Sequence, residues 1–303
     1  AENINTSSEF IGTVLFNESM KKHTTFEVGG PAEIFLEPTT LESFCFVENY
    51  LKQQKQKYFI LGNGSNIVVS EKGISGFVLS TKKIQSIKYD SKSGELRCDA
   101  GCTFDQITQY CIQHSLSGLE CFAGLPASIG GAIFMNARCY GYSISDILNC
   151  VEYLDKSGSI GTYYMDSKDL AYKQSPFKTF LVGTSVLAAR FTLQKGEKDT
   201  IIANCQKNIE NRKVKGHYKY PSAGSVFKNN HDFGKPSGQL VDEAGLKGVK
   251  CGGAQIAPWH GNFIVNIGSA TADDIKKLVE QASLAVYNQT GFKLECEIIF
   301  CGD

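Results

Sequence analysis

The chain has 303 residues, more than one hydrophobic core usually serves, so about two or three packed subdomains are expected. Its 42% hydrophobic residues suffice to build them, and 31 basic residues balance 31 acidic ones. With zero net charge and no basic block, the composition argues against nucleic-acid and anionic-membrane partners and favours a small-molecule protein.

Localisation and metal binding are constrained by features that the sequence lacks. Residues 1–10 have neither the basic start nor the apolar stretch of a secretory signal, although the missing Met leaves earlier N-terminal processing open. No apolar run approaches the length of a membrane span. The 11 cysteines, from Cys45 to Cys301, lack the CxxC spacing of zinc or redox sites. We therefore expect a cytoplasmic protein with reduced thiols, no membrane segment and no metal.

The first predicted subdomain, residues 1–80, combines short strands with one helix. Strands are predicted at 26–28, 34–36, 58–61 and 67–69. Thr39 and Glu42 have capping-box spacing before an amphipathic helix that ends near Gln54. A βαβ-like unit therefore places the loop Gly62-Asn63-Gly64-Ser65-Asn66 between two strands.

The second predicted subdomain, residues 81–196, holds more strands and the chain's densest run of small residues. Strands are predicted at 84–89, 96–100, 151–154 and 180–193. Thr103 and Gln106 form a second capping box. The small residues occupy 124–132, and the charged stretch 194–200 is the expected boundary.

The last part, residues 197–303, reads as a separate α/β unit. A helix is predicted over 201–213, and a second, longer helix is capped by Thr271 with Asp274 three residues on. Alternating residues at 293–300 predict a final strand. The expected fold class is α+β, with two subdomains followed by a smaller α/β domain.

The loop at residues 62–66 is a candidate anion site. Successive N–H groups in a Gly/Ser/Asn loop form a concavity for an anion, and glycine lets a phosphate approach the backbone. A Rossmann fingerprint is excluded because Ile67 stands where glycine is needed, and no Lys-Ser/Thr pair completes a Walker loop. An ordinary tight turn is the alternative, and for this loop alone it is favoured.

A second small-residue loop strengthens the case for a cofactor. Its backbone could contact a flat or charged ligand, with a hydroxyl and amides as donors; close packing of a helix against a sheet is the alternative. The candidate residues are Gly124, Leu125, Pro126, Ser128, Gly130 and Gly131. Two such loops together favour a cofactor that contains a pyrophosphate.

The last third offers polar residues that could do chemistry. Ser225 lies in a turn three residues before Lys228, although no GxSxG elbow surrounds it and no histidine is singled out as its partner. Glu295 and Glu297 are two apart on the predicted final strand, so their side chains are expected on one face. A satisfied loop serine and solvent-facing edge carboxylates are the alternatives.

Taken together, six stretches in order resemble the UDP-N-acetylenolpyruvoylglucosamine reductases. They are residues 25–32, 61–66, 124–136, 221–229, 252–255 and 294–297. The resemblance implies a two-subdomain FAD-binding fold of the vanillyl-alcohol-oxidase type and a substrate domain. The short join before the last domain is similar to the family branch that lacks a substrate-covering insertion.

The resemblance also implies a reaction and residues for it. In the family, a hydride passes from NADPH through FAD to an enolpyruvyl ether on UDP-N-acetylglucosamine, which yields UDP-N-acetylmuramate for peptidoglycan. Enolate chemistry needs a positioned acid and hydrogen-bonding partners. Ser225 matches the family's proton donor, and Glu297 matches the residue that supports the enolate, in its protonated form.

The sequence departs from the family at its third catalytic position. Lys173 follows Tyr172 where the family has arginine, so the charge is kept but the planar fork that grips a carboxylate is lost. Arg138, at a position where the family usually has a small residue, could supply a guanidinium; an exposed surface arginine is the alternative. The expected substrate contacts are Tyr172, Lys228, Asn229 and Gln255.

Two other functions stay open at this point. An oxidase of the same flavin fold would act on an alcohol or sugar, although the Ser225 and Glu297 motifs argue against it. A non-catalytic protein that binds flavin or nucleotide is compatible with the change at Lys173. A monomer that acts on a small UDP-sugar, with no nucleic-acid partner, is the expected state.

Overall fold

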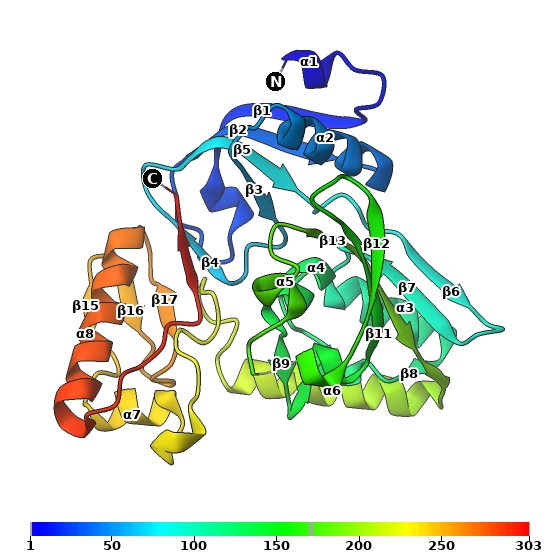
Figure 1. Cartoon of the computed structure of the whole chain (residues 1–303). Coiled ribbons are helices and arrows are strands. Elements are labelled where there is room, and N and C mark those ends of the chain that lie inside the picture. The colour runs from blue at the N-terminus through cyan, green and yellow to red at the C-terminus, as the bar shows by residue number, and fades with distance from the viewer. Residues whose placement is uncertain (1, 170–171, 303) are drawn as a thin grey trace. The chain divides into compact units, whose positions relative to one another are not determined.

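A computed structural model describes residues 2–169 and 172–302, which form two compact units (Figure 1). The first unit comprises Ala1–Leu15, Ile34–Asn63 and Gly76–Glu210, and the second comprises Phe16–Glu33, Gly64–Ser75 and Asn211–Asp303. The chain passes from one unit to the other within β1, β2 and β5, in the loop at residues 62–66, and within α6.

A four-stranded sheet and two helices make up the first core of unit one. The strand order is β1 (Gly12–Ser19), β2 (Pro31–Pro38), β5 (Ile74–Ser80) and β3 (Tyr58–Leu61), and β3 runs parallel to β5. Helix α2 (Leu41–Gln53) buries Phe44, Val47 and Leu51 in this core, and the short helix α1 (Glu2–Asn5) adds the buried Ile4. The apolar stripe predicted for residues 39–54 is therefore the packed face of α2.

An antiparallel sheet of five strands makes up the second core of unit one. Its order is β12 (Ile160–Tyr164), β11 (Leu148–Leu154), β13 (Ser185–Thr192), β7 (Glu95–Asp99) and β6 (Ile87–Asp90). Helices α3 (Phe104–His114) and α4 (Ile129–Met135) pack their apolar residues against its strands. The remaining elements are β8 (Leu116–Ser117), η2 (Glu120–Phe122), β9 (Arg138–Cys139), β10 (Tyr142–Ser143), η3 (Ile144–Asp146), η4 (Ser167–Asp169), α5 (Pro176–Thr179), β14 (Gln194–Lys195) and α6 (Lys198–Val214).

Unit two packs two helices on short strands. Its three-stranded sheet has the order β15 (Lys250–Cys251), β16 (Ala254–Ile256) and β17 (Ile264–Asn266), and β18 (Ile299–Cys301) pairs in parallel with β4 (Ile67–Val69). Helix α8 (Ala272–Thr290) supplies the buried Ile275, Leu278 and Val286 to the core, and α7 (Ser237–Glu243) supplies Leu240 and Val241. Two 3-10 turns complete the unit, η1 (Met20–His23) and η5 (His231–Phe233).

Two of the three predicted helix N-caps are confirmed and one is shifted, and the helix predicted over 201–213 is α6, which begins three residues earlier at Lys198. Capping boxes are present at Thr103–Gln106 and at Thr271–Asp274. Helix α2 is capped by Thr40, whose hydroxyl accepts a hydrogen bond from the Ser43 amide, so the box predicted from Thr39 is wrong by one residue. Thr39 and Thr40 both carry a hydroxyl that can cap a helix, and the three-residue spacing from Thr39 to Glu42 favoured Thr39, which is not the cap.

Several predicted strands are wrong or shorter than expected. Residues 26–28 form a loop in which Glu27 has a positive φ, and the buried Phe26 and Val28 produced the strand-like pattern. The strand predicted from residue 180 begins at Ser185, and the one predicted from residue 84 begins at Ile87. The final strand predicted over 293–300 is reduced to β18 and an isolated bridge at Cys296.

A buried ion pair fixes α2 to its sheet. The Glu48 carboxylate is fully buried and lies 2.9 Å from the ammonium of Lys52, and it accepts hydrogen bonds from Tyr58 at 3.0 Å and Ser185 at 2.6 Å. Replacing Lys52 with Met leaves a buried charge without its cation. We expect the free energy of unfolding to fall by about 3 kcal/mol, measured by urea denaturation.

The pair Lys277–Asp273 provides a matched control. It has the same i,i+4 spacing on α8, but both side chains are more than half exposed. Water screens such a pair, so Lys277→Met should leave the urea midpoint unchanged. Equal urea midpoints for the two variants would show that burial of Glu48 does not determine the loss of stability in Lys52→Met.

Candidate functional site

The first glycine loop leaves consecutive amides available to a ligand. Gly64 has φ +70°, and a Cβ at this position would overlap the carbonyl oxygen of His23. Its own carbonyl accepts a hydrogen bond from the Thr25 amide at 3.1 Å, which holds the turn. Among residues 2–169 and 172–302, no acceptor receives the backbone N–H of Gly64, Ser65 or Asn66. Three such N–H groups in a row are the donors that a phosphate requires.

The start of this loop is tied to the second small-residue loop within unit one. The Asn63 side chain donates to the carbonyl of Pro126 at 2.9 Å, and the Asn63 amide donates to the Ser128 hydroxyl at 3.3 Å. A Cβ on Gly62 would lie 2.5 Å from the same hydroxyl oxygen. The two predicted cofactor loops are therefore in contact, and glycine at position 62 permits the approach.

The second loop uses several of its donors within the chain. Ser128 is the N-cap of α4, and its hydroxyl accepts a hydrogen bond from the Gly131 amide at 3.4 Å. The amides of Ile129 and Gly130 donate to the carbonyls of Cys102 and Ala100, each at 2.9 Å. The close packing considered above is thus present, and a contribution of this loop to cofactor binding stays a prediction.

Replacing Gly64 with Ala tests whether the first loop holds a ligand. Besides the cost of about 1–2 kcal/mol for a positive φ, the new methyl group would displace the His23 carbonyl and distort the three amides. We expect FAD affinity, measured by quenching of flavin fluorescence, to fall at least about 10-fold. The control is Gly234→Ala, because Gly234 has φ +66° and open space around an added Cβ. Equal losses of affinity would contradict the assignment.

Ser225 lies on a short strand-like segment of unit two. It follows Gly224, whose φ is +72°, and forms an isolated bridge with Phe263. The next residue, Val226, accepts a hydrogen bond from the Glu297 amide at 2.7 Å. The main chains of the two predicted catalytic residues are therefore neighbours, although they are 72 positions apart in the sequence.

Glu297 is connected to the first glycine loop. The Asn66 side chain donates to the carbonyl of Glu297 at 3.0 Å, and the Ile299 amide donates to the Asn66 carbonyl at 2.9 Å. Glu297 is 9% exposed, whereas the Glu295 side chain is 70% exposed and pairs with Lys228. The two carboxylates therefore differ in exposure, and the common face expected for them stays a prediction.

The expected substrate residues of unit two also support its main chain. The Asn229 side chain accepts a hydrogen bond from the Ser237 amide at 2.9 Å, and the Gln255 side chain donates to the Gly248 carbonyl at 3.0 Å. Lys228 is held by Glu295. Their part in substrate binding stays a prediction.

Lys173 lies in a strained turn of unit one. Its φ is +59°, and its ammonium lies 5.8 Å from the centre of the half-exposed Tyr172 ring. Lys178 donates to the Lys173 carbonyl at 3.5 Å, and the Ser175 hydroxyl donates to the Phe134 carbonyl at 2.8 Å. This turn is therefore tied to the C-terminal end of α4.

Arg138 has the surroundings of a surface arginine. It lies on β9 with an exposed side chain, and its guanidinium donates to the Gly141 carbonyl at 3.4 Å. A role as a substitute for the family arginine stays a prediction.

The histidines near Ser225 are poor proton donors at neutral pH. Phe263 forms the bridge with Ser225. The ring centres of His217 and His260 lie 4.8 and 4.7 Å from the centre of the Phe263 ring. Burial, reinforced by the charge of Arg212, lowers the pKa of His217 to about 4. Burial lowers the pKa of His260 as well, so both rings are neutral at pH 7.

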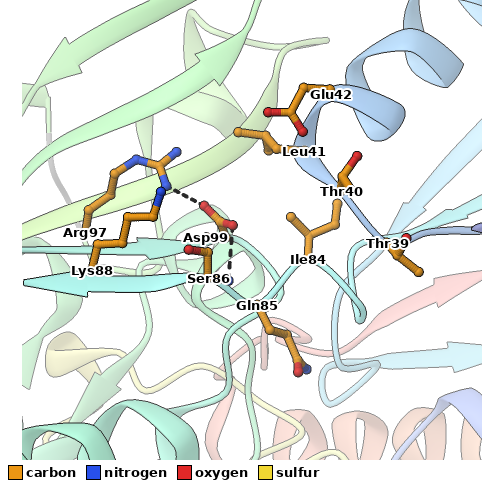
Figure 2. Close-up of a pocket in the computed structure, with 10 residues that line it drawn as sticks. All are labelled: Thr39, Thr40, Leu41, Glu42, Ile84, Gln85, Ser86, Lys88, Arg97 and Asp99. Atoms are coloured by element: carbon orange, nitrogen blue, oxygen red, sulfur yellow. Dashed lines mark hydrogen bonds and ion pairs between the residues drawn. The ribbon is translucent and has the colours of Figure 1, made fainter. Parts of the chain in front are cut away.

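A pocket in unit one is separate from all the predicted site residues. The cavity has a volume of about 370 Å³. In Figure 2, Thr40 at the N-cap of α2 and Glu42 of α2 lie across from Arg97 and Asp99 of β7. The Arg97 guanidinium donates to Asp99 at 2.6 Å and to Glu152 at 2.7 Å. Its charge is thereby neutralised within the chain, and we assign no function to this pocket.

The described part of the chain has neither a metal-binding cluster nor a membrane-spanning helix. Across positions 2–169 and 172–302, no group of three or more His, Cys, Asp or Glu side chains is arranged to hold a metal ion. No helix in this part of the chain combines the length and apolar character needed to cross a bilayer.

Comparisons with known proteins identify relatives over nearly the whole chain. An FAD binding domain model matches residues 32–163, and a model of the UDP-N-acetylenolpyruvoylglucosamine reductase C-terminal domain matches residues 216–301. The Treponema denticola UDP-N-acetylenolpyruvoylglucosamine reductase is 44% identical over 96% of this chain and 94% of its own length. The Borreliella burgdorferi enzyme is 39% identical over 94% and 93%.

A solved structure has the same fold. The crystal structure of UDP-N-acetylenolpyruvylglucosamine reductase from Thermus caldophilus superposes with a TM-score of 0.76, at 33% identity over 96% of this chain and 98% of that one. Together with the FAD binding domain match, this superposition confirms the predicted α+β, FAD-binding fold class.

Proposed function

The chain belongs to the UDP-N-acetylenolpyruvoylglucosamine reductase family, and we propose that Ser225, Glu297 and Lys173 carry its chemistry. It is an FAD-containing, NADPH-dependent oxidoreductase of peptidoglycan biosynthesis, which reduces UDP-N-acetylglucosamine enolpyruvate to UDP-N-acetylmuramate. The residues present fit FAD, because the amides of residues 64–66 are available to a phosphate. FAD, when bound, relays the hydride from NADPH to the terminal carbon of the enolpyruvyl group.

Each of the three residues has a distinct part in the proposal. Hydride addition at the terminal carbon leaves negative charge on the adjacent carbon and its carboxylate. The Ser225 hydroxyl delivers a proton to that adjacent carbon, which balances the reduction. A protonated Glu297 donates a hydrogen bond to the developing enolate, and the Lys173 ammonium binds the carboxylate as a point charge.

The observation that carries the proposal is the pairing of the Ser225 segment with Glu297. The 2.7 Å hydrogen bond from the Glu297 amide to Val226 aligns these two segments side by side. Glu297 is also 9% exposed, so little of the residue is in contact with water. An acid and a proton donor on adjacent backbones suit the protonation of an enolate.

Flavin absorbance during the two half-reactions tests this function. NADPH should bleach the flavin bands of the purified protein under nitrogen, and UDP-N-acetylglucosamine enolpyruvate should restore them. Rapid recolouring by oxygen, with no response to the enolpyruvyl substrate, would indicate an oxidase of the same fold. Bound FAD that NADPH does not bleach would indicate a non-catalytic flavin protein.

The finer description of the molecule belongs to the proposal as well. We propose FAD-binding subdomains at residues 1–80 and 81–196 and a substrate domain at 197–303, which the matches at 32–163 and 216–301 support. We also propose a cytoplasmic monomer without nucleic-acid partners, and the balance of positive and negative charges supports the last of these. Light scattering after size exclusion would reveal an oligomer.

A further inference from the structure

A buried amide holds the segment that carries Ser225. Asn262 is 4% exposed, and its side-chain oxygen accepts a hydrogen bond from the Phe227 amide at 2.8 Å. Its side-chain nitrogen donates to the Phe227 carbonyl, also at 2.8 Å, and its own carbonyl accepts from the Val226 amide at 2.9 Å. One residue therefore makes three hydrogen bonds to the two positions that follow Ser225.

The segment depends on these bonds because its strand pairing is sparse. Ser225 and Phe227 take part only in isolated bridges, to Phe263 and Cys296, and not in a continuous ladder. Gly224, just before them, has a positive φ, a conformation that glycine adopts without strain, and an added Cβ would meet no other atom within 4 Å. The Asn262 side chain both donates and accepts, so it satisfies the N–H and C=O of Phe227 in place of a neighbouring strand.

We propose that Asn262 is a positioning residue for proton transfer by Ser225, an inference that rests on the proposed role of that serine. By fixing Val226 and Phe227, Asn262 fixes the main chain that directs the serine hydroxyl. It also secures the edge on which Val226 pairs with Glu297. Asn262 itself does not touch the substrate in this proposal.

Asn266 supplies a matched control in the same unit. It is 8% exposed, donates to the Phe26 carbonyl at 3.0 Å, and accepts from the amides of Gly268 and Ala270 at 3.0 and 3.1 Å. Replacing either asparagine with Ala removes a buried amide that makes several main-chain hydrogen bonds. Both variants therefore lose buried hydrogen bonds to the main chain, but only Asn262→Ala loses those that hold the segment after Ser225.

The main experiment measures flavin kinetics and amide exchange in both variants. Asn262→Ala should slow reoxidation of the reduced flavin by the enolpyruvyl substrate about 10- to 100-fold, with flavin reduction by NADPH unchanged. Hydrogen–deuterium exchange at residues 224–229 should accelerate in Asn262→Ala and not in Asn266→Ala. Wild-type reoxidation in Asn262→Ala, or equal slowing in both variants, would overturn the inference.

Asn262→Asp keeps the test decisive if the alanine variant does not fold. A neutral carboxyl retains one donor and one acceptor, whereas an ionised carboxylate loses the donor and repels the Phe227 carbonyl. The ratio of wild-type to variant reoxidation rates should therefore rise with pH, and a flat ratio would reject positioning by Asn262. Ser225→Ala separates the two hypotheses. If this variant reoxidises its flavin at the wild-type rate, the role of the serine is rejected. If it reoxidises slowly while the Asn262 variants react at the wild-type rate, only the positioning role of Asn262 is rejected.

Discussion

Ser225→Ala should leave flavin reduction by NADPH at the wild-type rate and slow flavin reoxidation by the enolpyruvyl substrate about 10²- to 10⁴-fold. The first half-reaction transfers a hydride and needs no proton from this hydroxyl. The second places negative charge beside the substrate carboxylate, and that charge must be neutralised by a proton. Stopped-flow absorbance of the flavin measures the two rates separately.

Ser222→Ala is the control for this experiment. Ser222 lies three residues earlier in the same turn, where its main-chain carbonyl accepts a hydrogen bond from the Thr25 hydroxyl at 2.7 Å. Alanine preserves that carbonyl, so both half-reactions should proceed at wild-type rates. If Ser225→Ala slowed both half-reactions alike, the serine would affect flavin placement and not protonation.

Local features of the fold were predictable because their causes lie within a few residues. The capping boxes at Thr103 and Thr271 depend on a hydroxyl and a side chain three positions apart, and both helices begin there. The loop at residues 62–66 lies between β3 and β4 as predicted. The failure at residues 293–300 has the opposite cause, since alternation alone does not supply a partner strand of matching length.

The long-range contacts that support the candidate site were not predictable from local patterns. Asn66 contacts the Glu297 carbonyl across 231 positions, and Asn262 contacts Phe227 across 35. A buried asparagine that bonds main chain has no periodicity, and in the sequence it looks like any loop residue. Its only local signal is the run His260-Gly261-Asn262, which is typical of a turn. The predicted reacting residues, in contrast, came from motif resemblance and required no knowledge of the packing.

The second large effect is expected at Lys173. Removing the ammonium in Lys173→Ala takes away a charged hydrogen bond to the substrate carboxylate, typically about 1.5–3 kcal/mol, or roughly 10- to 100-fold in kcat/KM for the enolpyruvyl substrate. Flavin reduction by NADPH should not change. Steady-state turnover at saturating NADPH gives kcat and KM, and unchanged values for the enolpyruvyl substrate would reject the role.

The strained turn at Lys173 dictates which substitutions isolate the charge. Lysine, alanine and arginine all carry a Cβ, so the φ of +59° penalises them alike, whereas glycine would relax the turn and confound the result. Lys173→Arg restores the planar fork and should keep kcat/KM at or above the wild-type value if the ammonium binds a carboxylate. Loss of activity in the arginine variant equal to that in Lys173→Ala would mean that the position requires the shape of lysine, and carboxylate binding by a point charge would be the wrong explanation.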